Sequence, residues 1–278
     1  QRELRELVKY RKSLTEERTR ELNRLQKMLE GANIKISGTI KDINGKSSRN
    51  ILELIVSGET IDSARYDLLY KQKAIAHNLK ASKEQIIDDL NGVMTDLQRK
   101  VIRVLLRHVD ELTAHISELD DDIDNFMKPE EKQAAKKIQQ VPGIGNTSAQ
   151  AVIAVIGTDM DRFPTQAHIA SWAGLCPGDN TSAKKRKSGK TRKGNQLLRA
   201  TLVTCAHSAV KNKASYFYAQ YMRISAHRGK KRAIVAVAHS ILIAIFHILK
   251  CDYPFRDLGA DYYNQFNRER KISAYLKK

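Results

Sequence analysis

The sequence predicts a mainly α-helical protein, in which two long helices form an antiparallel coiled-coil arm and a helical domain follows. Three observations support this fold class. Leucines recur at helical spacing through residues 1–30, and apolar residues return at helical spacing between residues 97 and 126. Alternation with a period of two, which marks a half-buried strand, is scarce in residues 141–251. We therefore expect little sheet.

The arm is expected to begin with an amphipathic helix of about eight turns, which Gly31 ends. Shorter elements follow, including a helix over residues 62–78. A second long helix then ends at Pro129. Its apolar stripe is Val101, Val104, Leu105, Leu112, Ile116, Leu119, Ile123 and Phe126. The stripes allow an intermolecular, oligomerising arm or a bundle within one chain. Their length favours the arm.

Three segments are expected along the chain. Residues 1–128 form the coiled-coil and helical oligomerisation region, residues 129–251 form a second domain, and residues 252–278 form an irregular tail. The polar stretch 129–140 is interpreted as the joint between the first two. Helices are expected over residues 149–156, 167–173, 195–212, 214–223 and 230–249.

The last apolar run, residues 233–249, is interrupted by His239, Ser240 and His247. It is short and polar for a bilayer span, so no membrane partner is expected. Isolated histidines on such a helix are more often buried and hydrogen-bonded than metal ligands. We therefore expect both to be buried and predict no metal site.

The composition indicates a polyanionic partner. Lys and Arg number 49 against 31 Asp and Glu, which gives a net charge of +18. The acids concentrate in residues 110–131 and the bases in residues 184–231. The three cysteines are far apart and fit a reducing, cytoplasmic location. The chain opens with Gln1 inside a helical pattern, so a fragment or a truncated product is expected.

Residues 141–145 read Val-Pro-Gly-Ile-Gly and precede a helix of small residues. This pattern predicts a helix-hairpin-helix-like element, since glycines permit a tight turn and the next helix presents free N–H groups to a phosphate. The expected DNA contacts here are Gly143, Gly145, Asn146 and Thr147. The alternative is a simple helix–helix turn with glycine as a C-cap.

A basic loop lies within residues 174–199, between apolar segments. Its expected DNA-binding residues are Lys184, Lys185, Arg186, Lys187, Lys190, Arg192 and Lys193, and Arg199 lies beyond them. A second basic cluster, Arg228, Lys230, Lys231 and Arg232, opens the last helix. Cations are unfavourable at a helix N-terminus, which argues for an external anion there. The alternative for both clusters is solvated surface.

Ser182 is the candidate nucleophile, because the surrounding cations would stabilise charge on an attacked phosphate. Thr181, Ser188 and Thr191 compete for this role. From the residues alone, a hydroxyl in a polar loop is more often a hydrogen-bonding turn residue.

Six segments resemble the C-terminal part of transposases of the insertion sequence 110 family. They are residues 141–145, 156–163, 171–178, 188–195, 228–233 and 253–259. Residues 10–18 and 23–26 resemble the start of that family's coiled coil. The resemblance implies a transposase domain in residues 129–251, whose catalytic serine follows a Gly-Leu-x-Pro segment. Ser182 matches that serine, which in this family attacks DNA and forms a covalent phosphoseryl intermediate.

The resemblance also implies homo-oligomers and a structured bridge RNA that guides target choice. Family members carry an N-terminal RuvC-like domain with metal-binding acids, which this sequence lacks. No cofactor is therefore expected on this chain, and Mg²⁺ is expected only with that domain. We expect part of a bacterial DNA transposase that is inactive alone. The alternatives are an inactive DNA-binding and oligomerising remnant, or a DNA-repair helix-hairpin-helix protein.

Overall fold

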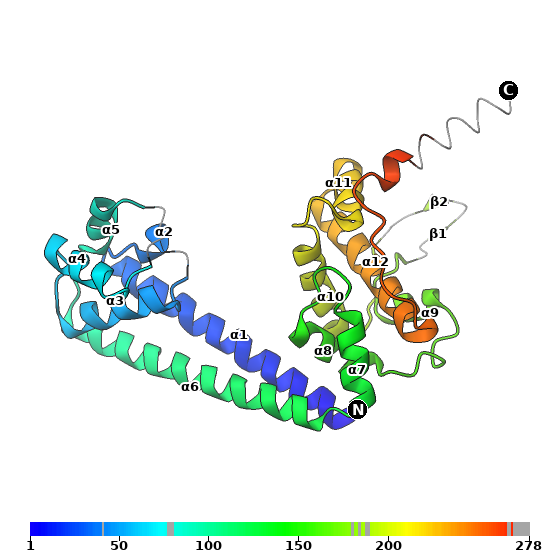
Figure 1. Ribbon diagram of the computed structural model, residues 1–278, viewed down its shortest axis with the longest axis horizontal. Coiled ribbons are helices and arrows are strands. Elements are labelled where there is room, and N and C mark those ends of the chain that lie inside the picture. The colour runs from blue at the N-terminus through cyan, green and yellow to red at the C-terminus, as the bar shows by residue number, and fades with distance from the viewer. Residues whose placement is uncertain are drawn as a thin grey trace. The chain divides into compact units, whose positions relative to one another are not determined.

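The computed structural model describes residues 1–40, 42–76, 81–178, 181–182, 185–186, 190–265 and 268, and the described part is mainly α-helical, as predicted (Figure 1). The chain divides into two compact units. The small unit is Tyr10–Leu119, and the large unit combines Gln1–Lys9 with Asp120–Lys278. The two long helices α1 (Arg2–Gly31) and α6 (Asp96–Phe126) contribute to both units. The predicted functional division at residues 128 and 251 stays a prediction.

Four short helices complete the small unit: α2 (Ile36–Thr39), α3 (Lys46–Ser57), α4 (Ser63–Lys71) and α5 (Lys83–Leu90). Asp62 and Ser82 cap α4 and α5 by accepting a hydrogen bond from the backbone N–H three residues later. Buried residues from these helices join the end of α1 and the start of α6 in one apolar cluster, which includes Leu25, Leu29, Ile51, Ile86 and Ile102. This cluster gives the small unit its own core.

Within the small unit, α1 and α6 pack in opposite directions. Leu14 forms an apolar cluster with Leu112 and Ile116, and an Arg18 guanidinium nitrogen donates to the Thr113 hydroxyl at 3.3 Å. The predicted stripe on α6 is partly wrong. Ile102, Leu106 and Val109 are buried, whereas Val101, Val104 and Phe126 are exposed. Helix α1 and the short helices that pack on α6 together select the buried face, which the spacing along α6 does not identify. The coiled-coil arm itself stays a prediction.

The large unit contains α7 (Pro129–Ile138), α8 (Asn146–Ile156), α9 (Gln166–Trp172), α10 (Gln196–Ala209), α11 (Tyr216–Arg228) and α12 (Lys230–Cys251). The antiparallel pair β1 (Thr181–Ser182) and β2 (Lys185–Arg186) lies between α9 and α10. Every residue from 149 to 156 of α8 is buried. Helices α7 and α10 pack on α8, and α12 packs against α7, α9, α10 and α11. The core of the unit therefore lies around α8 and α12.

The interpretation of residues 129–140 as a joint is wrong, because most of this stretch is helix α7. The Glu131 carboxylate caps it by accepting a hydrogen bond from the backbone N–H of Lys128 at 3.0 Å. Ala134, Ala135 and Ile138 are buried in the large unit's core. Alanine is small and only weakly hydrophobic, so a helix that buries two alanines looks polar in sequence.

The first residues of the chain also belong to this core. Leu4 and Val8 are buried, and the Arg5 guanidinium donates to the carbonyl oxygens of Ala154 and Val155, both at 3.4 Å. These carbonyls lie in the last turn of α8, where a helix has no further backbone N–H groups to donate to them. Arg5 therefore closes the C-terminal end of the central helix.

Helix α12 has the length and apolar composition of a helix that could cross a membrane. Nine of its side chains are buried against neighbouring helices, which accounts for that composition in a core helix. His239 is half-buried, whereas His247 is exposed and lies 2.7 Å from Oε1 of Gln166. The expectation that both histidines are buried is therefore wrong for His247.

Residues 252–258 follow α12 without regular secondary structure and pack on the large unit. The Phe255 N–H donates to Gln140 Oε1 at 3.2 Å, and its ring stacks on Phe217 with centroids 6.0 Å apart. The Tyr216 N–H donates to the Asp257 carboxylate at 2.8 Å. These contacts fix the segment beside α11.

Candidate nucleic-acid interface

The turn between α7 and α8 contains two glycines in different surroundings. Gly143 has a φ of +87°, and a Cβ there would lie 2.3 Å from the carbonyl oxygen of Cys205 and 2.8 Å from the nitrogen of Ala209. Gly143 therefore permits close packing of the turn on α10. Gly145 is exposed, and a Cβ added to it would have no atom within 4 Å.

Gly145 is also the N-cap of α8, so no side chain at that position satisfies the first N–H groups of the helix. Asn146 and Thr147 follow it and are exposed. The positive end of the α8 dipole thus faces solvent through residues 145–147, where a phosphate can approach. Gly145, Asn146 and Thr147 lie at this end of the helix, and their contact with a phosphate stays a prediction.

The basic loop leaves the large unit as a hairpin with a tightly packed base. Gly174 has a φ of +71°, and a Cβ on Gly194 would lie 2.3 Å from the Gly174 nitrogen. Beyond this contact, Pro177 pairs with Thr191, and the Gly178 N–H donates to the Lys190 carbonyl at 2.9 Å. Two glycines in backbone contact therefore bring both ends of the loop together.

Farther out, Thr181 pairs with Arg186 and Ser182 pairs with Lys185 across β1 and β2. The backbone of the candidate nucleophile is thus part of this hairpin. The side chains of Ser182, Lys185 and Arg186 lie outside the described part of the structure, as do Lys184 and Lys187. Their DNA contacts and the role of Ser182 stay predictions.

A cavity of about 830 Å³ opens at the base of the hairpin; we call it the basic cavity. The segments around the hairpin base, together with α10, α11 and α12, form its walls. Among the described residues, four cations line it, Lys190, Arg199, Lys231 and Arg232, and no acidic side chain does. The fold thus joins the loop and the start of α12, two basic clusters that lie apart in sequence.

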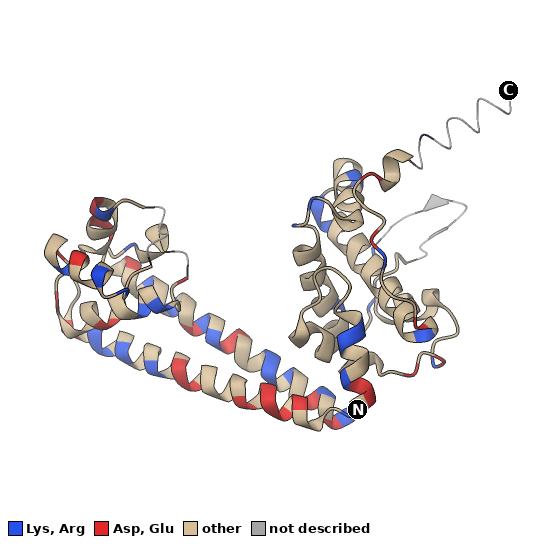
Figure 2. Cartoon of the chain, viewed as in Figure 1, with Lys and Arg blue, Asp and Glu red and all other residues tan. Residues whose placement is uncertain are grey.

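The remaining predicted cations lie elsewhere on the surface. Arg192 and Lys193 are exposed on the return strand of the hairpin, and Arg228 and Lys230 are exposed around the start of α12. Acidic residues are concentrated in the last turns of α6 (Figure 2).

Sequence reasoning missed four polar residues that line the basic cavity: Arg199, Gln220, His239 and Ser240. Arg199 lies beyond the predicted DNA-binding residues of the loop, and the fold brings it to the site. The signal for His239 and Ser240 was their spacing from Arg232 and Ala236, which places all four on one face of α12. Gln220 comes from α11, and no spacing in the sequence links it to that face.

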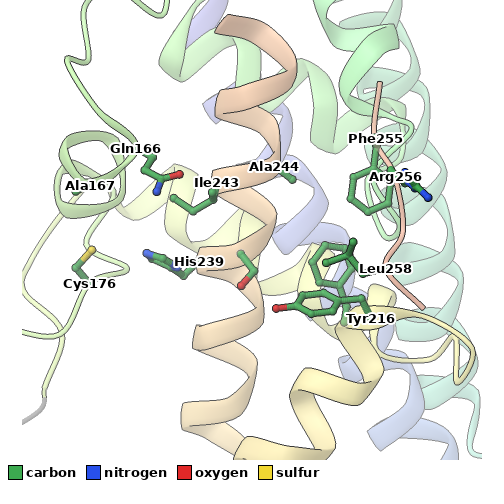
Figure 3. A pocket seen from close by; sticks show the side chains of 12 residues that line it. Gln166, Ala167, Cys176, Tyr216, His239, Ile243, Ala244, Phe255, Arg256 and Leu258 are labelled. Carbon is green, nitrogen blue, oxygen red and sulfur yellow. The ribbon is translucent and has the colours of Figure 1, made fainter. Parts of the chain in front are cut away.

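A second cavity of about 530 Å³ shares His239 and Ser240 with the first. Figure 3 shows α12 between Cys176 and Gln166 on one side and Tyr216 and Leu258 on the other. Burial raises the pKa of the Cys176 thiol and lowers the pKa of His239. Both side chains are therefore neutral near pH 7, which argues against a cysteine nucleophile activated by histidine.

Tyr216 is equally unsuited to attack a phosphate. Burial, followed by the hydrogen bond to Tyr263, raises the pKa of Tyr216. The two hydroxyl oxygens lie 2.8 Å apart, and the Arg223 guanidinium lies 4.6 Å from the centroid of the Tyr263 ring. This cluster holds residues 262–263 against α11.

Among the described residues, no three His, Cys, Asp or Glu side chains gather in a way that could hold a metal ion. The acidic residues of α6, such as Asp120 and Asp124, lie along a helix end. The described side chains therefore do not fit a Mg²⁺ site.

The comparisons with known proteins cover this part of the chain. Residues 135–222 match the model of the transposase IS116/IS110/IS902 family. A probable family 20 transposase of Pseudomonas aeruginosa (strain PAO1) is 28% identical over 113 residues, which is 40% of this chain and 32% of the relative. The matched region thus spans about a third of that relative's length. From α7 through the hairpin into α11, the chain therefore resembles a transposase domain of the IS116/IS110/IS902 family.

Proposed function

We propose that this chain is the DNA-binding and strand-exchange part of a bacterial, cytoplasmic transposase that moves an insertion sequence. The match of residues 135–222 to a transposase family supports the class of activity. The observation that carries the assignment is the hairpin that holds Ser182. Its base borders a cavity whose described lining contains four cations and no acidic residue.

The chemistry assigned to Ser182 is a transesterification. Its hydroxyl oxygen forms a bond to a DNA phosphorus, and the bond from that phosphorus to one sugar oxygen breaks. The hydroxyl proton leaves to a base or to water, and the released sugar oxygen takes up a proton. Because a phosphoseryl ester conserves the bond energy, a second sugar hydroxyl can reverse the step and join a new strand. Cations around the hairpin stabilise the charge that develops on the phosphate.

The remaining contacts position the DNA. Gly145, Asn146 and Thr147 lie at the start of α8, at the positive end of its dipole, and the exposed cations Arg192 and Lys193 add charge. Contacts of this kind fix the orientation of a duplex without selecting a sequence. Each phosphate neutralised by Lys or Arg adds about 0.9 to the slope of log affinity against log salt.

Mg²⁺ is assigned to a RuvC-like domain outside these 278 residues, since the described side chains do not fit a metal site.

In the test, the protein is incubated with end-labelled insertion-sequence DNA. Wild type is expected to give a labelled band that survives denaturing electrophoresis, and Ser182→Ala is expected to lose it while keeping DNA affinity. Ser188→Ala, a serine of the same loop, is the matched control and keeps the band. A band that persists in Ser182→Ala, or that disappears only in Ser188→Ala, overturns the serine assignment.

The alternative function is a DNA-binding and oligomerising remnant without chemistry. It predicts salt-sensitive DNA binding with no covalent band in wild type. The same experiment therefore separates the two functions.

We also propose that the protein is a homo-oligomer through the arm. The support is an uncovered apolar face of α6, where Leu97, Val101 and Val104 follow one another at helical spacing with exposed fractions of 71%, 37% and 62%. Val104→Glu is expected to lower the mass measured by light scattering, whereas Lys71→Glu, at an exposed position on α4, is expected to leave it unchanged. A structured guide RNA is proposed as a second partner, supported only by the net charge of +18.

A further inference from the structure

We propose that the basic cavity receives one unpaired nucleotide of the DNA strand that the hairpin engages. The proposal rests on the proposed function and adds a base-binding site to it. Four properties of the cavity support it: its charge, its lining, its volume and its place beside the hairpin.

The charge suits the phosphate of a nucleotide. Lys231 and Arg232 are exposed at the start of α12, where they can meet an anion at the mouth of the cavity. Arg199 donates one hydrogen bond to the Gly174 carbonyl at 2.7 Å, which orients its guanidinium at the hairpin base. A guanidinium carries five N–H donors, so this bond leaves others for a phosphate oxygen.

The inner lining suits a base. Leu175, Pro177, Val235 and Ala236 supply apolar surface, against which the faces of an unstacked base can pack. A contact to duplex backbone alone needs charge and no apolar hollow. The combination of cations with an apolar interior therefore favours an unpaired nucleotide over a paired one.

Polar groups are available for the edge of the base. Gln220 Nε2 donates to Ser240 Oγ at 2.8 Å, while Gln220 Oε1 is buried and accepts no hydrogen bond from the described part of the chain. If the amide were turned over, Nε2 would lack the partner instead. A small rotation of the Gln220 amide brings its unpaired atom to the edge of the base, where a hydrogen bond removes the free-energy cost of burying that atom without a partner. His239 borders the cavity, and burial lowers its pKa and keeps the ring neutral, so it presents one donor and one acceptor.

The size and place of the cavity fit the same ligand. Its volume of about 830 Å³ lies within the range of small-molecule sites, about 300–1,000 Å³. Pro177 lines it, and Ser182 lies five positions farther along the chain, so their Cα atoms are at most about 18 Å apart. That length corresponds to about five nucleotide steps of a duplex strand, at about 3.4 Å each. A nucleotide held in the cavity would therefore set which phosphate lies near Ser182.

The experiment compares the affinity of the full chain for three labelled DNAs of equal length. One is fully paired, one carries a single bulged nucleotide, and one carries an abasic residue in the bulge. The bulged duplex is expected to bind about tenfold more tightly than the paired duplex, because its extra nucleotide is already unpaired. The abasic bulge keeps the phosphate and loses the preference.

Ala236→Phe and Val235→Phe fill the cavity and are expected to abolish the preference while keeping affinity for the paired duplex. Ala226→Phe is the matched control, since Ala226 is exposed on α11 and does not line the cavity. The retained affinity for paired DNA shows that each variant is folded. If one filling variant fails to fold, the other decides.

Each outcome has one meaning. Equal affinity for the three DNAs in wild type overturns the cavity assignment and leaves the proposed function standing. A preference that survives both filling variants also overturns it. Absence of binding to any of the DNAs contradicts the proposed function itself. Capture of a free nucleoside monophosphate in the cavity, without a preference for the bulge, overturns the assignment to a DNA strand.

Discussion

Substitution of Gly143 by alanine tests whether this glycine serves packing. Its φ of +87° is one that L-residues adopt only with strain. The added Cβ would lie 2.3 Å from the Cys205 carbonyl oxygen, 2.8 Å from the Ala209 nitrogen and 3.0 Å from the Ala209 Cβ. Two of these three are backbone atoms of α10, so the conflict is relieved only if the turn and α10 separate.

The expected loss is the sum of three contributions. The left-handed backbone costs about 1–2 kcal/mol. Overpacking of a core contact costs about 1–3 kcal/mol. Alanine also restricts the conformations of the unfolded chain, which stabilises the folded state by about 0.4–1 kcal/mol. Because the contact is with backbone, we expect a net loss in the upper part of this range, about 2–4 kcal/mol. For a unit of this size, that corresponds to a fall in Tm of about 5–15 °C.

The assay is thermal and urea unfolding followed by circular dichroism, with Gly145→Ala as the control. Gly145 has a φ of −91°, and an added Cβ would have no atom within 4 Å, so its substitution should cost under about 1 kcal/mol, the usual penalty for alanine at an N-cap. Equal losses of stability in the two variants would show that the packing argument is wrong.

Three further outcomes are expected. Gly194→Ala places a Cβ 2.3 Å from the Gly174 nitrogen, so it should weaken DNA binding and speed trypsin cleavage within residues 190–193, and unchanged cleavage would contradict the tight hairpin base. Arg5→Ala should lower the free energy of unfolding in urea by about 1–2 kcal/mol through loss of its bonds to α8; Lys9→Ala, which removes an exposed ion pair, should cost under about 0.5 kcal/mol. Burial lowers the pKa of His239 from 6.5, so the imidazole takes up a proton more readily in the unfolded chain than in the folded one. The neutral, buried His239 therefore costs no stability above pH 6.5, and the free energy of unfolding declines as the pH falls from there toward the folded pKa. His239→Gln should remove that part of the acid-induced loss in urea unfolding, and an unchanged pH profile would contradict it.

The mainly α-helical fold could be predicted because helical periodicity is a local property. The last helix, expected over residues 230–249, is α12, Lys230–Cys251. The prediction failed at α7, where the buried residues Ala134 and Ala135 carry little hydrophobic signal. A weak apolar face becomes core only when neighbouring helices cover it, and no local pattern reports that.

The stripe on α6 failed for a related reason. The helix carries apolar residues on more than one face, so Val104 and Leu106 are equally plausible core residues from spacing alone. The structure buries Leu106 and leaves Val104 62% exposed. Helix α1 and the short helices that share a core with Leu106 make that choice, and their positions are a tertiary property.

The positive charge of the candidate site could be predicted from the sequence, whereas its shape could not. Runs of Lys and Arg show directly in the sequence, so both basic clusters were found. The basic cavity forms only because four separate segments come together, which contribute Pro177, Arg199, Gln220 and Ala236. These residues lie far apart along the chain, and nothing in the sequence indicates that they are neighbours. The contact of Gly174 with Gly194 is equally invisible, since each glycine taken alone is compatible with an ordinary turn.

The turn of residues 141–145 shows how one motif can serve folding and binding with different residues. A phosphate-binding interpretation assigned the same role to both glycines, yet a glycine packed on α10 cannot be replaced without moving a core helix, whatever it binds. Only Gly145 combines exposure with a position at the start of α8. Because the two roles fall on different residues, they separate experimentally. Gly143→Ala should lose stability first and DNA affinity only as a consequence of unfolding. A bulkier change at residue 145 should weaken binding in a protein that stays folded. If Gly145→Val leaves both the affinity and its salt dependence unchanged, the turn is a structural connection and the hairpin with its cavity is the whole interface.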